Sequence, residues 1–359
     1  MGAKLANEAE IVEKFKEAQN ALVIQASDLS LETVSQMAQT GAIDVSPQFQ
    51  RRERWDVRRQ SALIESFLMN VPVPPVYLSE DDYGSYSVID GKQRITAIRD
   101  FMTDAFPLSP LDRFHEISGL KFSELPSQLQ NSLTVRPYIR AITILRQSDR
   151  STKYEVFHRL NSGGEPLNAQ EIRNVIYRGA LNDLIMELSE APFLRKQLKI
   201  KDNKSSAYNL MSDAEIVLRY FVLAEEWRDF SGDYRHSMDN YMERNSVIKK
   251  SQLDALRSQF NRALDACEAI WGDYSFKRPD GLGWRDQVLA GMFDAQMVAV
   301  TLADDQRISS MISRRREVLQ STRDLFDDSQ FDNSVRVSTN TASRVHYRIE
   351  KVWELASRF

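Results

Sequence analysis

Five consecutive residues have the types and spacing that phosphate chemistry needs: Asp90, Gly91, Lys92, Gln93 and Arg94. Gly91 permits a positive φ and a close backbone approach by a ligand. Asp90 is suited to cap a helix, or to bind a Mg²⁺ ion that accompanies a triphosphate. Arg94 is suited to clamp phosphate oxygens, with Lys92 and Gln93 as further donors. A purely structural role also stays open, because Asp-Gly is a common turn and basic residues often lie on solvated helix ends.

A strand and a helix must position this turn. Residues 85–89 alternate in the way that is typical of a strand, with Tyr86 and Val88 on one side and Ser87 and Ile89 on the other. After the turn, apolar residues recur at helical spacing: Ile95, Ile98, Phe101 and Met102. The N-terminus of such a helix carries unpaired N–H groups and the positive end of the helix dipole. The arrangement therefore predicts an anion site.

A second cluster covers residues 48–59 and contains five arginines, two aromatic residues and only two acidic residues. Arginine interleaved with aromatic rings can bind phosphates or stack on bases. The alternative is a charged loop with Trp55 packed into the core.

A third cluster, residues 157–168, is rich in Gly and Asn and lies between two predicted helices. Such a loop can direct backbone N–H groups at a ligand. A helix C-cap followed by an N-cap at Asn168, with Glu171 completing a capping box, explains most of it without a function. The chain has neither a GxxxxGK[ST] phosphate loop nor a GxGxxG fingerprint.

Metal ligands and nucleophiles are poorly represented. The four histidines, at 115, 158, 236 and 346, are scattered and lack ligand spacing. The single cysteine, Cys267, lies in a helical pattern and is expected to be a small buried side chain. The run Arg314-Arg315-Arg316 is expected on a solvated helix face, with nucleic-acid contact as the alternative.

Composition sets the broad class. The chain has 359 residues, 42% of them hydrophobic and 27% charged, as is typical of a folded protein with about two domains. A net charge of −4 argues against a globally basic nucleic-acid coat, although a local basic groove stays open. One cysteine, no signal-like N-terminus and no apolar run of about 18 residues together predict a cytoplasmic protein with no membrane partner.

The elements predict an α+β protein in three parts. A helical extension is expected over residues 1–40, and a small mixed sheet with helices over 41–178. Short strands are expected within 41–47, at 76–78 and at 138–145, and helices at 58–70, 122–133 and 151–160. Strand-like runs almost vanish beyond about residue 180, so 179–359 is expected to be all helical.

Taken together and in order, the three clusters resemble one family. Gln50-Arg51 with Trp55, then Ile89 to Arg94, then Phe157 to Leu167 are similar to the N-terminal domain of the GmrSD-type modification-dependent restriction endonucleases. That family has the signature Asp-Gly-Gln-Gln-Arg and is related to the ParB/sulfiredoxin-like nucleotide-binding fold. The resemblance covers roughly residues 40–178.

The resemblance implies a function. Such domains bind and hydrolyse nucleoside triphosphates with Mg²⁺, and they gate restriction of modified or foreign DNA in antiviral defence. By this resemblance the phosphate-binding turn comprises Asp90, Gly91, Gln93 and Arg94, with Lys92 within it, and its catalytic residues are Asp90, Gln93 and Arg94. Gln50 and Arg51 are its partners across the pocket, Asn161 and Gly164 form a third wall, and Asp90 is the Mg²⁺ ligand.

The sequence departs from the family's pattern at two points, and each leaves an alternative function open. Lys92 stands where the family has Gln, and an ammonium cannot accept a hydrogen bond from an attacking water. Hydrolysis is therefore less firmly predicted than binding, and a nucleotide-gated DNA-binding module without turnover is the alternative. The second half also lacks the paired His and Asn residues of the family's appended nuclease. A separate nuclease or defence subunit is then an expected partner besides DNA, with the chain as its adaptor. The alternatives that the N-terminal part itself acts weakly as a DNA endonuclease, and that the chain forms a homo-oligomer, stay open.

Overall fold

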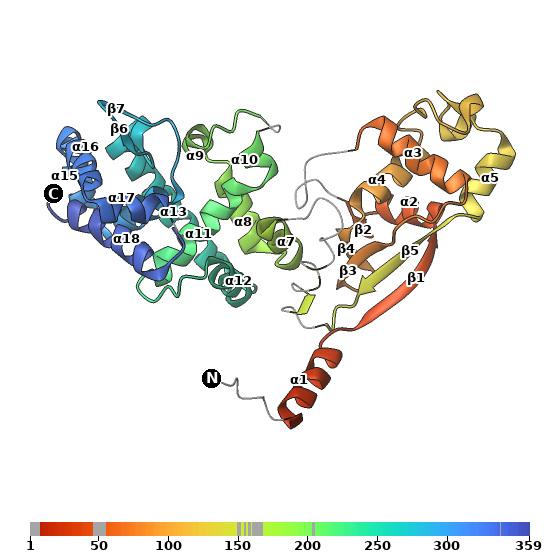
Figure 1. Ribbon diagram of the computed structural model, residues 1–359, viewed down its shortest axis with the longest axis horizontal. Coiled ribbons are helices and arrows are strands. Elements are labelled where there is room, and N and C mark those ends of the chain that lie inside the picture. The colour runs from red at the N-terminus through yellow and green to blue at the C-terminus, as the bar shows by residue number, and fades with distance from the viewer. Residues whose placement is uncertain are drawn as a thin grey trace, which may run out of the picture. The chain divides into compact units, whose positions relative to one another are not determined.

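The computed structural model describes residues 8–45, 55–148, 152–153, 156, 159, 168–202, 205–337 and 339–359. The chain forms two compact units, Met1–Ile176 and Tyr177–Phe359, named below the N-terminal unit and the C-terminal unit (Figure 1). None of the helices in the described ranges combines the length and the hydropathy that a bilayer crossing requires.

A five-stranded mixed sheet with the order β1-β5-β3-β4-β2 forms the base of the N-terminal unit. Its strands are β1 (Ile24–Ser30), β2 (Ile43–Asp44), β3 (Val76–Asp82), β4 (Ser85–Asp90) and β5 (Tyr138–Ile144). β1 is antiparallel to β5 and β4 is antiparallel to β3, whereas β3 is parallel to β5 and β2 is parallel to β4. With the helices this confirms the predicted α+β class. Kinship with the ParB/sulfiredoxin-like fold stays a prediction.

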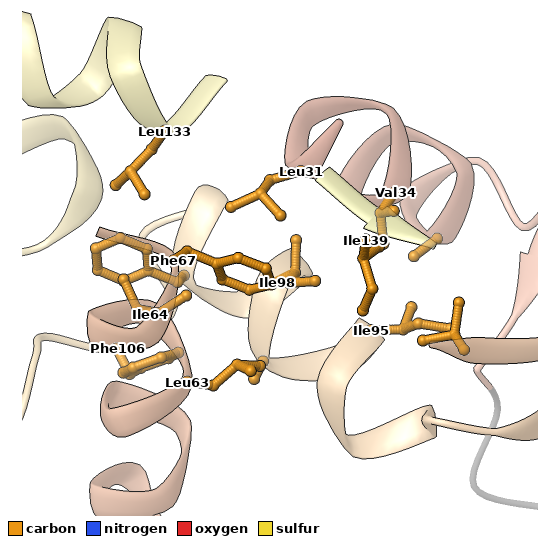
Figure 2. Close-up of a cluster of buried hydrophobic side chains, with 14 of the residues drawn as sticks. Leu31, Val34, Leu63, Ile64, Phe67, Ile95, Ile98, Phe106, Leu133 and Ile139 are labelled. Carbon is orange, nitrogen blue, oxygen red and sulfur yellow. The ribbon is translucent and has the colours of Figure 1, made fainter. Parts of the chain in front are cut away.

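The N-terminal unit has six helices in its described residues. They are α1 (Glu8–Asn20), α2 (Leu31–Gln39), α3 (Val57–Leu68), α4 (Lys92–Met102), α5 (Ser127–Val135) and α7 (Ala169–Ile176), with short 3₁₀ turns η1 (His115–Ile117) and η2 (Phe122–Glu124). Of these helices, α2, α3 and α4 pack on one face of this sheet and α7 packs on the other. Figure 2 shows the main core, in which Val34 of α2, Phe67 of α3 and Ile98 of α4 come together. A smaller cluster joins Ile172 of α7 to the sheet residues Ile89 and Ile144.

Neighbouring residues of β4 therefore enter different cores. Val88 lies in the main core and Ile89 in the smaller one, as their opposite parity predicts. Because both faces of the strand are covered, the end of β4 is held from two sides.

The predicted helical extension over residues 1–40 is corrected by the structure. Residues 8–20 and 31–39 are helical, but Ile24–Ser30 is an edge strand that pairs along its full length with β5. The strand is largely exposed, with Ile24 58% accessible, so its sequence lacks a buried alternating face. Only pairing with a strand far along the chain makes it extended.

The C-terminal unit is helical, as predicted, apart from a small hairpin of β6 (Pro279–Asp280) and β7 (Gly283–Trp284). Its helices are α8 (Ala180–Ser189), α9 (Pro192–Gln197), α10 (Ser206–Asn209), α11 (Ser212–Glu226), α12 (Tyr234–Arg244), α13 (Lys250–Trp271), α14 (Ala290–Leu302), α15 (Asp305–Ser313), α16 (Arg315–Asp324), α17 (Ser329–Arg336) and α18 (Ala342–Ala356), with 3₁₀ turns η4 (Gly272–Tyr274) and η5 (Leu325–Asp327). The residues from Gly291 to Val300 are all buried, so α14 runs through the centre of this unit.

Candidate functional site

The turn between β4 and α4 joins two elements that both contribute buried side chains to the cores of the N-terminal unit. Asp90 is the last residue of β4 and pairs with Tyr77 of β3. Directly after the turn, α4 buries Ile95, Ile98 and Phe101 completely in the main core. Figure 2 shows Ile95 and Ile98 pointing into that cluster. The core therefore fixes the direction of α4 and the place of its N-terminus.

Gly91 is required by this turn. Its φ is +92°, in the left-handed region that side chains disfavour. A Cβ atom added there would lie 2.5 Å from Cγ1 of Val76 on the neighbouring strand. The close approach of the turn to β3 is thus possible only with glycine.

Arg94 holds the turn together. Its Nη2 donates to Oδ2 of Asp90 at 2.8 Å and to the carbonyl oxygen of Pro75 at 3.0 Å. The Arg94 side chain is 15% exposed and that of Asp90 is 41% exposed. Among the described residues the Nε of Arg94 is buried and has no hydrogen-bond partner. The guanidinium therefore ties the end of β4 to the segment before β3.

The helix that follows begins without a side-chain cap. Gly91 occupies the N-cap position, and no side-chain cap hydrogen bond is formed there within the described part of the chain. The first turn of α4 contains no acidic residue and carries Lys92, Gln93 and Arg94. A helix N-terminus with this composition attracts anions through its backbone N–H groups and its dipole.

Trp55 links the arginine-rich cluster to this turn. The backbone N–H of Trp55 donates to Oε1 of Gln93 at 3.0 Å, and its carbonyl oxygen accepts from Nε2 of Gln60 at 2.8 Å. Asp56 then begins α3 by accepting from the N–H of Arg59. The Trp55 side chain also packs against the main core, as the structural alternative predicts. The Gln93–Trp55 contact has no sequence signal, because it joins a side chain to a backbone group 38 residues away.

Several predicted site residues lie outside the described residues. They are Gln50 and Arg51 in the second cluster, and Asn161 and Gly164 in the third. The structural interpretation of the end of the third cluster is confirmed. Oδ1 of Asn168 accepts from the N–H groups of Gln170 and Glu171, and Oε2 of Glu171 accepts from the N–H of Asn168 at 2.7 Å. This is the predicted capping box at the start of α7.

Asp90 suits a single magnesium contact. Mg²⁺ with a nucleotide usually takes one or two protein carboxylates, and its other ligands are phosphate oxygens and water. One oxygen of Asp90 is bound to Arg94, and the half-exposed side chain leaves room for a ligand at the other. The described residues contain no group of three or more His, Cys, Asp or Glu side chains that could hold a metal without a substrate.

The other residues considered for chemistry lie where a structural role explains them. Cys267 is fully buried, and burial raises the pKa of its thiol well above the ordinary value, so it stays protonated. Arg314, Arg315 and Arg316 are exposed where α15 meets α16, and Arg314 pairs with Glu317. The solvated-face interpretation of this run fits these positions.

Comparison with known proteins identifies the segment that contains the turn. Residues 31–178 match the family described as GmrSD restriction endonuclease, N-terminal domain. The match begins with α2 and ends just after α7, and it confirms the resemblance predicted from the three clusters. It relates this segment, residues 31–178, to the N-terminal domains of restriction endonucleases. No curated protein and no solved structure matches the chain.

Proposed function

We propose, from the match of residues 31–178 to the N-terminal domain of GmrSD restriction endonucleases, that the N-terminal unit binds a nucleoside triphosphate with Mg²⁺ and hydrolyses it. The phosphates lie at the β4–α4 turn, and the bound nucleotide controls an action on DNA. The observation that carries this proposal is the uncapped start of α4 at Gly91, where the core holds a helix N-terminus with two basic residues in its first turn.

Each residue of the turn has a distinct part in this proposal. Gly91 lets phosphate oxygens approach the backbone, and Lys92 neutralises their charge. Arg94 stabilises the charge that develops on the transferring phosphoryl group, in exchange for part of its contact with Asp90. Gln93 keeps the backbone of Trp55 next to the turn. Asp90 would hold the Mg²⁺ ion that accompanies the triphosphate, and the ion would supply positive charge that lowers the repulsion among the phosphates.

Binding without turnover is the second candidate, and two observations favour it. Arg94 is engaged with Asp90 and Pro75, and Lys92 lacks the acceptor oxygen of the family's Gln. In this case the triphosphate acts as a switch for DNA binding. The variant Lys92→Gln restores the acceptor oxygen. If the missing acceptor is what prevents turnover, phosphate release should begin or increase in this variant. Lys92→Met, which also removes the charge but adds no acceptor, is its control.

The partners follow from the same proposal. DNA is the target, and a separate nuclease subunit cuts it while this chain supplies the nucleotide switch. A homo-oligomer is compatible with this arrangement.

The test measures triphosphate affinity by calorimetry and phosphate release for the full chain with Mg²⁺, with and without DNA. Arg94→Ala should lower affinity about tenfold or more and abolish phosphate release, because a charge-assisted contact to phosphate is lost. Arg99→Ala removes an arginine that pairs with Asp100 near the other end of α4, and should change neither. Equal affinity and equal phosphate release in Arg94→Ala and the unmodified protein would contradict the proposal.

A further inference from the structure

A hollow of about 380 Å³ lies along α3. It is bordered by Trp55, whose backbone contacts Gln93 of the β4–α4 turn. Its lining comprises Trp55, Arg59, Ala62, Leu63 and Ser66. The four residues from α3 are spaced by three and four positions, so they share one face of that helix. Sites for small ligands usually begin at about 300 Å³. The hollow therefore has room for a ring system.

Trp55 is held firmly at one end of this hollow. Hydrogen bonds fix its backbone on both sides, from its N–H to Gln93 and from Gln60 to its carbonyl oxygen. The half-buried side chain packs against the main core and also lines the hollow. An aromatic side chain that is already ordered loses little entropy when a ligand stacks on it.

Charge at the hollow favours an electron-rich or anionic ligand. Arg59 is exposed, and within the described residues its guanidinium forms no ion pair. The nearest acidic residue along the chain, Asp56, already accepts from the Arg59 N–H as the cap of α3. Glu65, on the same helix, is buried and accepts three backbone hydrogen bonds from residues 112–114.

We propose that this hollow receives the nucleobase of the triphosphate, which stacks on Trp55 beside Arg59. The inference rests on the proposed function, because the phosphates must occupy the β4–α4 turn. The Trp55–Gln93 hydrogen bond places the residue that lines the hollow directly against that turn. A base joined to the phosphates through its ribose is therefore the occupant that both features fit. Since all bases have a π-face, the site discriminates weakly among the four triphosphates.

The experiment compares ATP with inorganic tripolyphosphate, which carries the phosphates but no base. Calorimetry on the full chain with Mg²⁺ should show tighter binding of ATP in the unmodified protein. Trp55→Leu keeps an apolar side chain on the core and leaves the backbone N–H to Gln93 in place, but removes the ring. We expect it to lower ATP affinity about tenfold or more and to leave tripolyphosphate affinity unchanged.

Three comparisons complete the test. Trp55→Phe keeps a ring and should retain ATP affinity within about threefold. Trp284→Leu removes an aromatic ring from the C-terminal unit and should change neither affinity. Binding of the four triphosphates to the unmodified protein should agree within about tenfold.

The outcomes separate this inference from the proposed function. If neither ligand binds to the unmodified protein, the proposed function fails, and the inference fails with it. If both bind with equal affinity, the phosphate site stands and the base site is wrong. Equal losses for both ligands in Trp55→Leu would show that Trp55 acts through the turn, which also overturns the inference. The ATP-to-tripolyphosphate comparison needs no variant, so it decides the question even if Trp55→Leu does not fold.

Discussion

At the scale of single residues, Gly91 and Arg94 make the β4–α4 turn a rigid feature. Gly91 adopts a conformation that few other residues accept, and it lies against Val76. Arg94 connects Asp90 with the carbonyl oxygen of Pro75. The turn is therefore shaped before any ligand arrives, which reduces the entropy lost on binding.

Gly91→Ala should destabilise the N-terminal unit and abolish triphosphate binding. The left-handed backbone costs about 1–2 kcal/mol, and the contact with Val76 adds about 1–3 kcal/mol through overpacking. Urea unfolding and calorimetry measure the two effects. Gly84→Ala is the control, because Gly84 has a φ of +75° but open space around its Cβ position, so only the backbone effect applies. Equal destabilisation by both variants would show that the contact with Val76 is unimportant.

At the scale of elements, α3 connects the candidate site to the main core. Its outer face lines the hollow, whereas Ile64 and Phe67 pack in the core (Figure 2). On the same helix, the buried carboxylate of Glu65 accepts from the N–H groups of residues 112–114, at 2.7 Å for Arg113. Glu65 thus anchors the loop that leads from α4 to η1.

The stability of this anchor should depend on pH. Burial by itself would raise the pKa of Glu65, but hydrogen bonds from the N–H groups of Arg113, Phe114 and Asp112 hold it below the ordinary value of 4.5. Because the pKa is lower in the folded than in the unfolded state, the stabilisation is complete above about pH 4.5 and is lost as the pH falls through the folded-state pKa.

Glu65→Gln should lower the free energy of unfolding at pH 7 by about 1–3 kcal/mol, since it removes a buried charged acceptor. It should also flatten the loss of stability below pH 4.5. Urea unfolding at several pH values checks both effects, with the exposed Glu116→Gln as the control. An unchanged pH profile in Glu65→Gln would contradict this role.

At the scale of the whole molecule, each unit has its own apolar core, and the C-terminal unit adds a buried cluster of charged side chains. The N-terminal unit has an apolar core against a sheet. In the C-terminal unit, the fully buried Asp294 of α14 accepts from Arg219 of α11, Tyr234 of α12 and Arg348 of α18. Burial would raise the pKa of Asp294, but the two guanidinium groups hold it below its ordinary value. One carboxylate thus joins four helices.

Asp294→Ala should destabilise the C-terminal unit by about 3–5 kcal/mol, because it leaves two arginines buried without their carboxylate. Hydrogen exchange should show the loss of protection within residues 177–359, and thermal unfolding should show its size. Asp305→Ala breaks an ion pair with Arg262 in which the aspartate is 91% exposed, and should have little effect. Similar destabilisation by both variants would rule out a special role for the buried cluster.

Local patterns in the sequence predicted strand faces, a helix cap and the family of the N-terminal segment. The alternation of residues 85–89 predicted that Val88 and Ile89 lie on opposite faces of the strand, and Asn168 with Glu171 predicted the capping box of α7. The three ordered clusters predicted the family that residues 31–178 match. These signals are readable because parity, capping and motif spacing depend on residues close together in the chain.

Contacts between distant residues were decided only by the tertiary structure. The sequence around Ile24–Ser30 suggested a helix. This segment is the strand β1 because it pairs with β5, which lies far along the chain. Gln93 contacts the backbone of Trp55, and Arg94 the carbonyl oxygen of Pro75, through hydrogen bonds that any residue's backbone could make. The sequence therefore determined that a strand ends at Asp90, that a turn follows at Gly91, and that the next helix begins with basic residues. Long-range contacts decided that this turn packs against Val76 of β3 and is joined through Trp55 to the start of α3.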